Sequence, residues 1–267
     1  MQQPSSVVLP DHTAGAVFQA RLKAAAIHLG ASLLLAGAVA LLVFELWYPW
    51  PYREISGGRD LFLLVISVDV VLGPLLTLAV FNVRKPRAEL RRDIIVIALL
   101  QLAGLGYGLW TVQLARPAHL VFEIDRFRVV HRVDIPPELE TRAPAGIPVA
   151  PWTGPTALST RPFRSENEKM DFTLAALQGV QLGARPDLWE PYATGRDRIL
   201  AAAQPLAALN GRFPKEAARI DAAVRASART PDAVVFLPMM GRTADAWTVL
   251  LDARTAEILG YLPLDSF

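Results

Sequence analysis

The stretch of sequence that decides the fold is residues 61–83, LFLLVISVDVVLGPLLTLAVFNV. It is apolar over the length that a helix needs to cross a bilayer, about 20 residues, and carries a single charge, Asp69. A central aspartate costs about 2.5–3.5 kcal/mol on insertion, whereas each Leu, Ile, Val or Phe returns about 0.3–0.6 kcal/mol. The apolar residues outweigh the charge, so this stretch predicts a transmembrane helix.

Two further apolar runs, within residues 24–46 and 94–115, predict two more spans. The first run is longer than the core of a signal peptide, and Trp47, Tyr48, Pro49 and Trp50 follow it where a cleavage site would need small residues. We therefore interpret it as a retained anchor. Residues 21–116 form the predicted three-helix transmembrane domain, and residues 1–20, rich in Pro and Ser, the predicted flexible cytoplasmic tail.

The basic residues of the short loops set the predicted orientation. Residues 84–93 carry five Lys or Arg side chains, whereas residues 47–60 carry two, which two acids balance. By the positive-inside rule the N-terminus and the 84–93 loop are cytoplasmic, and residues 117–267 lie on the far side. Four aromatic residues after the first span are expected to form a belt at the outer interface: Trp47, Tyr48, Trp50 and Tyr52.

Polar and small residues gather on single faces of the predicted spans. Asp69, Gly73 and Thr77 recur at intervals of four, and Gln101 shares a face with the GxxxG pair Gly104 and Gly108. Three readings stay open. The faces pack the three helices together, with Asp69 bonded to Gln101 or to backbone; they dock another protein's transmembrane helix; or they form an ion or proton path, for which three helices with one acid are a poor conduit. The candidate intramembrane docking face comprises Asp69, Gly73, Pro74, Thr77, Gln101, Gly104 and Gly108.

The remaining residues, 117–267, predict an α+β domain. A hairpin is expected over residues 120–133, turning at Asp125 and Arg126. A Pro-rich connection that is extended or irregular is expected over residues 134–163. An apolar stripe of Met170, Leu174 and Leu177 marks the first expected helix. Helices are expected at 165–182, 196–209 and 214–227, and strands at 233–238, 246–251 and 257–262. We interpret the domain as helices packed on an antiparallel sheet.

The sequence offers no constellation for catalysis. Cysteine is absent, the four histidines are scattered, and the HExxH, GxSxG, P-loop and Gly-rich dinucleotide motifs are all missing. The formal net charge of +2 gives no polyanion-binding character. We therefore predict a protein that is not an enzyme, with no catalytic residues, no metal site, no cofactor and no nucleic-acid partner.

The order of motifs along the chain resembles one family, the TfpX/TfpZ-type type IV pilin accessory proteins of bacteria. The resemblance runs from about residue 20 to the end, and the segment Asp69-x-x-x-Gly73-Pro74-x-x-Thr77 is its most specific part. The other matching pieces are Arg21-Leu22-Lys23-Ala24, Ile27-His28-Leu29, Trp47-Tyr48-Pro49, Gln101-Leu102-Ala103, Tyr107-Gly108, Arg116-Pro117, Asp125-Arg126-Phe127, Arg185-Pro186-Asp187-Leu188, Pro191-Tyr192, Leu251-Asp252-Ala253-Arg254-Thr255 and Gly260-Tyr261-Leu262-Pro263-Leu264-Asp265.

The resemblance implies an inner-membrane accessory, with a periplasmic C-terminal domain, that helps a cognate type IV major pilin accumulate or assemble in the manner of a chaperone. The expected partners are the bilayer and the pilin. The pilin's transmembrane helix would meet the docking face, and its periplasmic head would meet the terminal strands or the Pro-rich segment. A homo-oligomer stays open, as does the alternative of a membrane-anchored sensor whose outer domain binds a ligand. The candidate periplasmic contact residues are Trp247, Asp252, Arg254, Thr255 and Tyr261.

Overall fold

The computed structural model describes residues 14–242 and 246–267. Most of the predicted cytoplasmic tail, residues 1–13, therefore lies outside the described residues. The chain divides into two compact units. The described part of the first unit covers residues 14–40 together with Phe62–Trp110, and the second unit joins Leu41–Leu61 to Thr111–Phe267. The loop after the first predicted span thus belongs to the same unit as the C-terminal domain.

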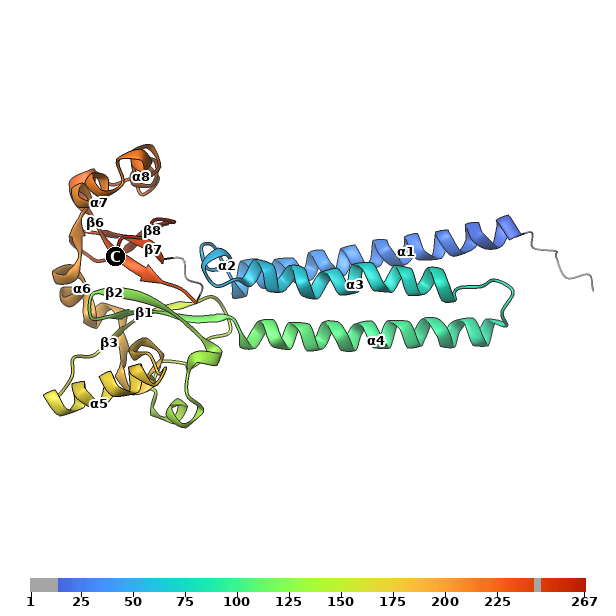
Figure 1. Cartoon of the computed structure of the whole chain (residues 1–267), viewed down its shortest axis with the longest axis horizontal. Helices are drawn as coiled ribbons and strands as arrows, with labels where there is room; N and C mark the ends of the chain where they lie inside the picture. Colours follow the sequence, from blue (N-terminus) through green and yellow to red (C-terminus); the bar gives the residue numbers. More distant parts are fainter. Residues whose placement is uncertain (1–13, 243–245) are drawn as a thin grey trace, which may run out of the picture. The chain divides into compact units, whose positions relative to one another are not determined.

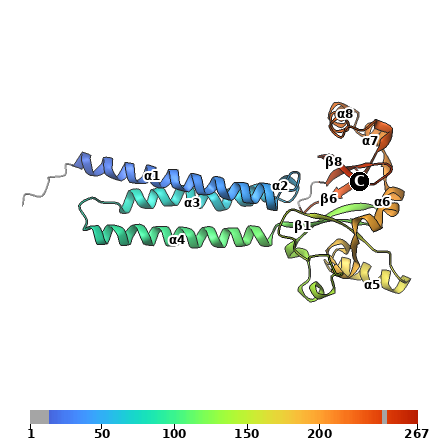
Figure 2. The same cartoon turned by 180° about the vertical axis from the view of Figure 1, so that it is seen from behind.

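Within the described residues, three helices are long and apolar enough to cross a membrane. They are α1 (Ala14–Leu41), which continues as a π-helix over Leu42–Trp47, α3 (Gly58–Val80) and α4 (Arg87–Leu114). Consecutive helices run in opposite directions in Figures 1 and 2. α3 continues through Pro74 without interruption. The three predicted spans are confirmed, and the chain is a membrane protein.

The second unit is built on one mixed sheet, with eight strands among the residues described. Its order is β4-β3-β1-β2-β6-β7-β8, and the short β5 also pairs with β6. The strands are β1 (Pro117–Glu123), β2 (Arg126–His131), β3 (Thr156–Thr160), β4 (Trp189–Pro191), β5 (Gln204–Pro205), β6 (Val234–Met240), β7 (Ala246–Asp252) and β8 (Ile258–Leu262). The α+β class is confirmed, as are the hairpin and the three terminal strands.

The prediction of a purely antiparallel sheet is wrong. β1 pairs in parallel with β3, and β2 pairs in parallel with β6. A parallel neighbour requires a long crossover, and each of these pairs has one: the Pro-rich segment leads to β3, and several helices intervene before β6. β3 lies in the segment that was expected to be extended or irregular, and its five residues fit between Pro155 and Pro162.

Two layers of side chains cover the sheet. On one face, Leu209 of α7 (Leu206–Arg212) and Ile220 of α8 (Ala217–Ala226) pack against Phe236 and Leu250. On the other face lies a larger cluster that includes β1, β2, β6 and β7. Ile199 of α6 (Arg196–Ala202) joins that cluster. Figure 1 shows α6, α7 and α8 following one another along the sheet.

Two helix predictions need correction. The single helix expected over residues 196–209 is divided into α6 and α7, because Pro205 cannot continue a helix and places β5 between them. α7 then ends at Arg212, three residues beyond the predicted end at residue 209. In α5 (Glu166–Leu177) the apolar stripe Met170, Leu174 and Leu177 is exposed, and Phe172 is the buried side chain instead.

Candidate functional site

The polar face of α3 begins at Asp69, whose side chain is buried within the helical unit. Gln101 of α4 donates from Nε2 to Asp69 Oδ1 (2.9 Å) and to the Asp69 carbonyl oxygen (3.1 Å). A Cβ on Gly73 would overlap the same Gln101 amide, so glycine leaves the space that this amide occupies. The aspartate therefore has a hydrogen-bond donor where no water would reach it, which lowers the cost of its burial.

One helical turn farther, the same face contacts α1. Thr77 Oγ1 lies 2.5 Å from His28 Nδ1, and Thr77 is buried. Asp69, Gly73 and Thr77 thus face the neighbouring helices α4 and α1, and contacts within the bundle account for all three. That a partner helix also contacts this face stays a prediction.

The two glycines of the predicted GxxxG motif differ. A Cβ on Gly108 would come within 2.5 Å of Val65 Cγ1, so this glycine lets α4 approach α3 closely. A Cβ on Gly104 would meet nothing within 4 Å. Pro74 is partly exposed, and Gln101 is engaged with Asp69. Of the predicted face, Gly104 therefore has the most open surroundings.

An open groove that the sequence analysis missed lies among α1, α3 and α4. Its volume is about 510 Å³, and small side chains line much of it: Ala20, Ala24 and Ala31 of α1 and Ala98 of α4. His28 and Thr77, which are bonded to each other, also line it. The available signal was the run of alanines four to seven residues apart on α1, a spacing that places them on one helix face.

The loop between the first two spans is part of the core of the second unit. It contains the short helix α2 (Tyr52–Ile55), and both Tyr52 and Ile55 belong to the large cluster on the sheet. Tyr52 Oη lies 3.0 Å from Tyr261 Oη, and a Cβ on Gly241 would overlap Ile55. Burial raises the pKa of Tyr52 well above its ordinary value, so its hydroxyl stays protonated in this contact.

The predicted aromatic belt is therefore mostly wrong. Protein atoms of the second unit cover the rings of Trp47, Tyr48 and Tyr52, which therefore cannot lie against lipid as a belt would. Tyr48 donates from its hydroxyl to the carbonyl oxygen of Val112 (3.2 Å). Trp50 alone of the four is half-exposed, and its ring meets the edges of Trp247 and Tyr261.

The predicted periplasmic contact residues have largely structural surroundings. Trp247 and Tyr261 pack against the loop rings, as described above. Asp252 Oδ1 accepts from the backbone N–H groups of Arg254 and Thr255 and fixes the turn between β7 and β8. These bonds and the Arg229 guanidinium hold the pKa of Asp252 well below its usual range. Arg254 and Thr255 are exposed, and their contact with a partner stays a prediction.

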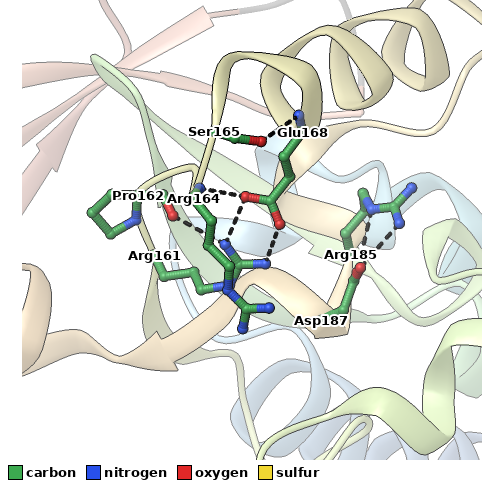
Figure 3. Close-up of polar contacts among 7 residues, drawn as sticks. All are labelled: Arg161, Pro162, Arg164, Ser165, Glu168, Arg185 and Asp187. Carbon is green, nitrogen blue, oxygen red and sulfur yellow. Dashed lines mark hydrogen bonds and ion pairs between the residues drawn. The ribbon is translucent and has the colours of Figure 1, made fainter.

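Glu166 and Glu168 lie in the first turn of α5. Figure 3 shows the contacts of Glu168 at this helix terminus. Ser165 caps the helix by accepting from the Glu168 backbone N–H (3.1 Å). The Glu168 carboxylate accepts two bonds from the Arg161 guanidinium and one from the Arg164 backbone. These donors lower the pKa of Glu168 to about 2. This arrangement fixes the loop that leads into α5.

His119 and His131 are both buried, and each has a partner. His119 Nδ1 lies 2.7 Å from Thr156 Oγ1, and its Nε2 lies 3.1 Å from the Val149 carbonyl oxygen. Burial lowers the pKa of His119 to about 4. His131 Nδ1 pairs with Asp134 at 3.0 Å. In the part of the chain that the structure describes, no three His, Cys, Asp or Glu side chains gather in a group that could hold a metal ion.

These features define a class of membrane protein. It has three apolar helices, a polar seam between them formed by Asp69, Gln101, Thr77 and His28, and an α+β domain whose core includes the loop between the first two helices. The chain belongs to the fimbrial assembly protein FimB family. That family description matches residues 16–57, which cover most of α1 and the loop with α2. The resemblance noted from the motifs is thus confirmed at the level of fimbrial assembly, and the narrower TfpX/TfpZ assignment stays a prediction.

Similar proteins occur in Dichelobacter nodosus. The fimbrial assembly protein of serogroup I is 33% identical over 92% of this chain and 95% of its own length. That of serogroup E1 is 32% identical over the same shares. That of serogroups C1 and C2 is 41% identical over 42% of this chain and 86% of its own length. No solved structure matches the chain.

Proposed function

We propose that the protein is a non-enzymatic accessory of type IV fimbrial assembly that holds a cognate major pilin in the inner membrane before it is polymerised. Its N-terminus is cytoplasmic and its C-terminal domain periplasmic, as the basic loop at residues 84–93 favours. The family relationship supports the assembly role, because the similar proteins of Dichelobacter nodosus carry that description over nearly their whole length.

The groove among α1, α3 and α4 carries this proposal. Helices associate in lipid where small residues let the backbones come close, and the alanines on α1 and α4 offer such a surface. Hydrogen bonds in the seam join Asp69 to Gln101 and Thr77 to His28, and so hold the three helices together. The shape of the groove is therefore fixed by contacts within the bundle. The groove extends along about three turns of α1, so it would receive one stretch of a pilin's transmembrane helix.

We propose a positioning role for the seam in place of the direct contact with the pilin that the motifs first implied. Asp69 and Gly73 act by fixing α4 against α3, and they position the groove without touching the pilin. The candidate face for direct contact moves to the groove and to Gly104, whose surroundings are open. The periplasmic domain would engage the pilin head, and the exposed Arg254 and Thr255 remain the candidates there.

The test uses a strain that lacks only this gene. Pilin protein is measured by immunoblot, pilin transcript by quantitative PCR, and function by twitching motility. The deletion is complemented with the wild type, with Ala31→Phe, or with Ala26→Phe. Both alanines are exposed on α1, and only Ala31 lines the groove, so Ala26→Phe is a matched control.

We expect the deletion to lose pilin protein at an unchanged transcript level. The wild type and Ala26→Phe should restore pilin, and Ala31→Phe should not, while all three chains reach the membrane in equal amounts. Normal pilin in the deletion strain would contradict the proposed function itself. Full restoration by Ala31→Phe would contradict the groove as the docking site.

A further inference from the structure

Trp152 is the most exposed tryptophan ring of the second unit, at 62% of its surface. It lies in a segment of the Pro-rich connection, residues 149–154, which we call the strap. Tryptophan side chains are on average highly buried, so an exposed one indicates a partner or a surface that it contacts. The ring is amphipathic, with an apolar body and one N–H donor.

Contacts from the end of the first span and from residues 116–119 fix the strap. The Trp152 ring meets the edge of Trp47 with centroids 5.8 Å apart, and Gly154 N–H donates to the Leu46 carbonyl oxygen at 2.5 Å. Arg116 donates to the Trp152 carbonyl oxygen at 3.3 Å. His119 Nε2 lies 3.1 Å from the Val149 carbonyl oxygen, at the other end of the strap.

The contacting residues place the strap at a defined depth along the chain. Leu46 and Trp47 are the last residues of the first membrane-spanning helix, and Arg116 lies just past Leu114, where α4 ends. These positions coincide with the predicted ends of the first and third spans, so we expect a ring held against them at the level where the helices leave the hydrocarbon. That is the headgroup layer, in which tryptophan is enriched because one part of its ring is apolar and one part is polar.

Several backbone groups of the strap are bonded within the chain. Pro151 inside the strap, and Pro148 and Pro155 on either side of it, have no N–H to leave unpaired. The carbonyl oxygens of Val149, Ala150 and Trp152 accept from His119 and Arg116. With the Gly154 N–H, four backbone groups of the strap therefore have partners within the chain.

We infer that Trp152 is a membrane-surface contact: its indole inserts into the lipid headgroup layer, and the strap rests on the bilayer beside the ends of the first and third spans. Trp50, the other exposed ring near the first span, contributes to the same contact. This inference is independent of the pilin proposal, because it needs only the chain and lipid.

The experiment uses the full chain in vesicles of phosphatidylcholine and phosphatidylglycerol, with no other protein present. Because the chain has no cysteine, Trp152→Cys provides a unique site for a nitroxide spin label. Its collision rates with oxygen, which partitions into lipid, and with a water-soluble nickel chelate give its depth. The controls are Asp197→Cys, at a side chain that is 87% exposed in the domain, and Leu34→Cys, at a residue that is 79% exposed within the first span.

We expect the label at position 152 to collide with nickel several-fold less often than the label at 197, and with oxygen less often than the label at 34. A nickel collision rate equal to that at 197 would overturn the inference, since the ring would then face water. Low collision rates with both reagents would overturn it as well, because the site would then be covered by protein.

A second measurement keeps the tryptophan in place. Lipids brominated near the headgroup quench fluorescence in the wild type and in Trp152→Phe, which retains an aromatic ring against Trp47. We expect the fraction of emission quenched by the shallow bromine to fall in the variant. Equal quenched fractions in the two proteins would contradict the inference even if the spin-labelled variant folded poorly.

Discussion

His119 makes the stability of the C-terminal domain depend on pH in a window that can be calculated. The imidazole is fully buried, and this burial lowers its pKa from 6.5 to about 4. Above pH 6.5 the imidazole is neutral in both the folded and the unfolded chain, and no penalty exists. Between pH 6.5 and 4 the unfolded chain binds a proton that the folded chain does not, so the free energy of unfolding falls as the pH falls.

The magnitude follows from the two pKa values. A shift of one pKa unit corresponds to about 1.4 kcal/mol, so the full penalty is about 3 kcal/mol at pH 4 and below. At pH 5 the penalty has reached about 2 kcal/mol. This is a large share of the 5–15 kcal/mol that is roughly typical of folded domains.

The assay is urea unfolding of the full chain in detergent micelles at pH 7.5 and pH 5, for the wild type and for His119→Gln. Trp189 reports on the region, since its ring centroid lies 4.5 Å from that of His119. Carboxylates titrate in both proteins alike, so the difference between their pH dependences isolates His119. We expect the wild type to lose about 2 kcal/mol more than the variant. Identical pH dependences would refute the reasoning.

Three further predictions concern other parts of the molecule. Gly73→Ala should push the Gln101 amide away from Asp69 and lower the thermal stability of the chain in micelles by about 1 kcal/mol. Gly104→Ala, in open space, should not, and equal effects of the two changes would contradict a stabilising bond between Gln101 and Asp69. Ile55→Ala should destabilise the C-terminal domain by about 2–5 kcal/mol in urea, and an unchanged midpoint would mean that the loop is no part of its core. Glu168→Gln should weaken the loss of stability below pH 4.5, because the carboxylate keeps its stabilising charge down to about pH 2; urea midpoints at pH 6 and pH 3 test this, and an unaltered acid dependence would count against it.

The membrane half of the fold could be predicted from the sequence because insertion depends on local composition. Runs of apolar residues of sufficient length identify the three spans whatever surrounds them. The polar face of α3 was also visible, since Asp69, Gly73 and Thr77 share a helix face. The bond between Asp69 and Gln101 was among the predicted readings and is confirmed. The contact between Thr77 and His28 was not predicted, because it depends on how α1 packs against α3.

The C-terminal domain was predictable only where neighbours along the chain pair with each other. The β1 and β2 hairpin and the β6, β7 and β8 meander were found, since short connections make such pairs. The parallel pairs joined across long connections were missed. The predicted burial was wrong for two residues. Tyr52 was expected at the membrane interface and lies in the core, and Leu174 was expected in the core and is exposed.

The claim that matters most is that a pilin helix occupies the groove among α1, α3 and α4. Photo-crosslinking in cells that express the cognate pilin tests it directly. A photoreactive amino acid replaces Ala31, inside the groove, or Ala26, exposed on α1 outside it. We predict a crosslinked product containing pilin from position 31 and much less from position 26. Equal crosslinking from both positions, or none from position 31, would contradict the account.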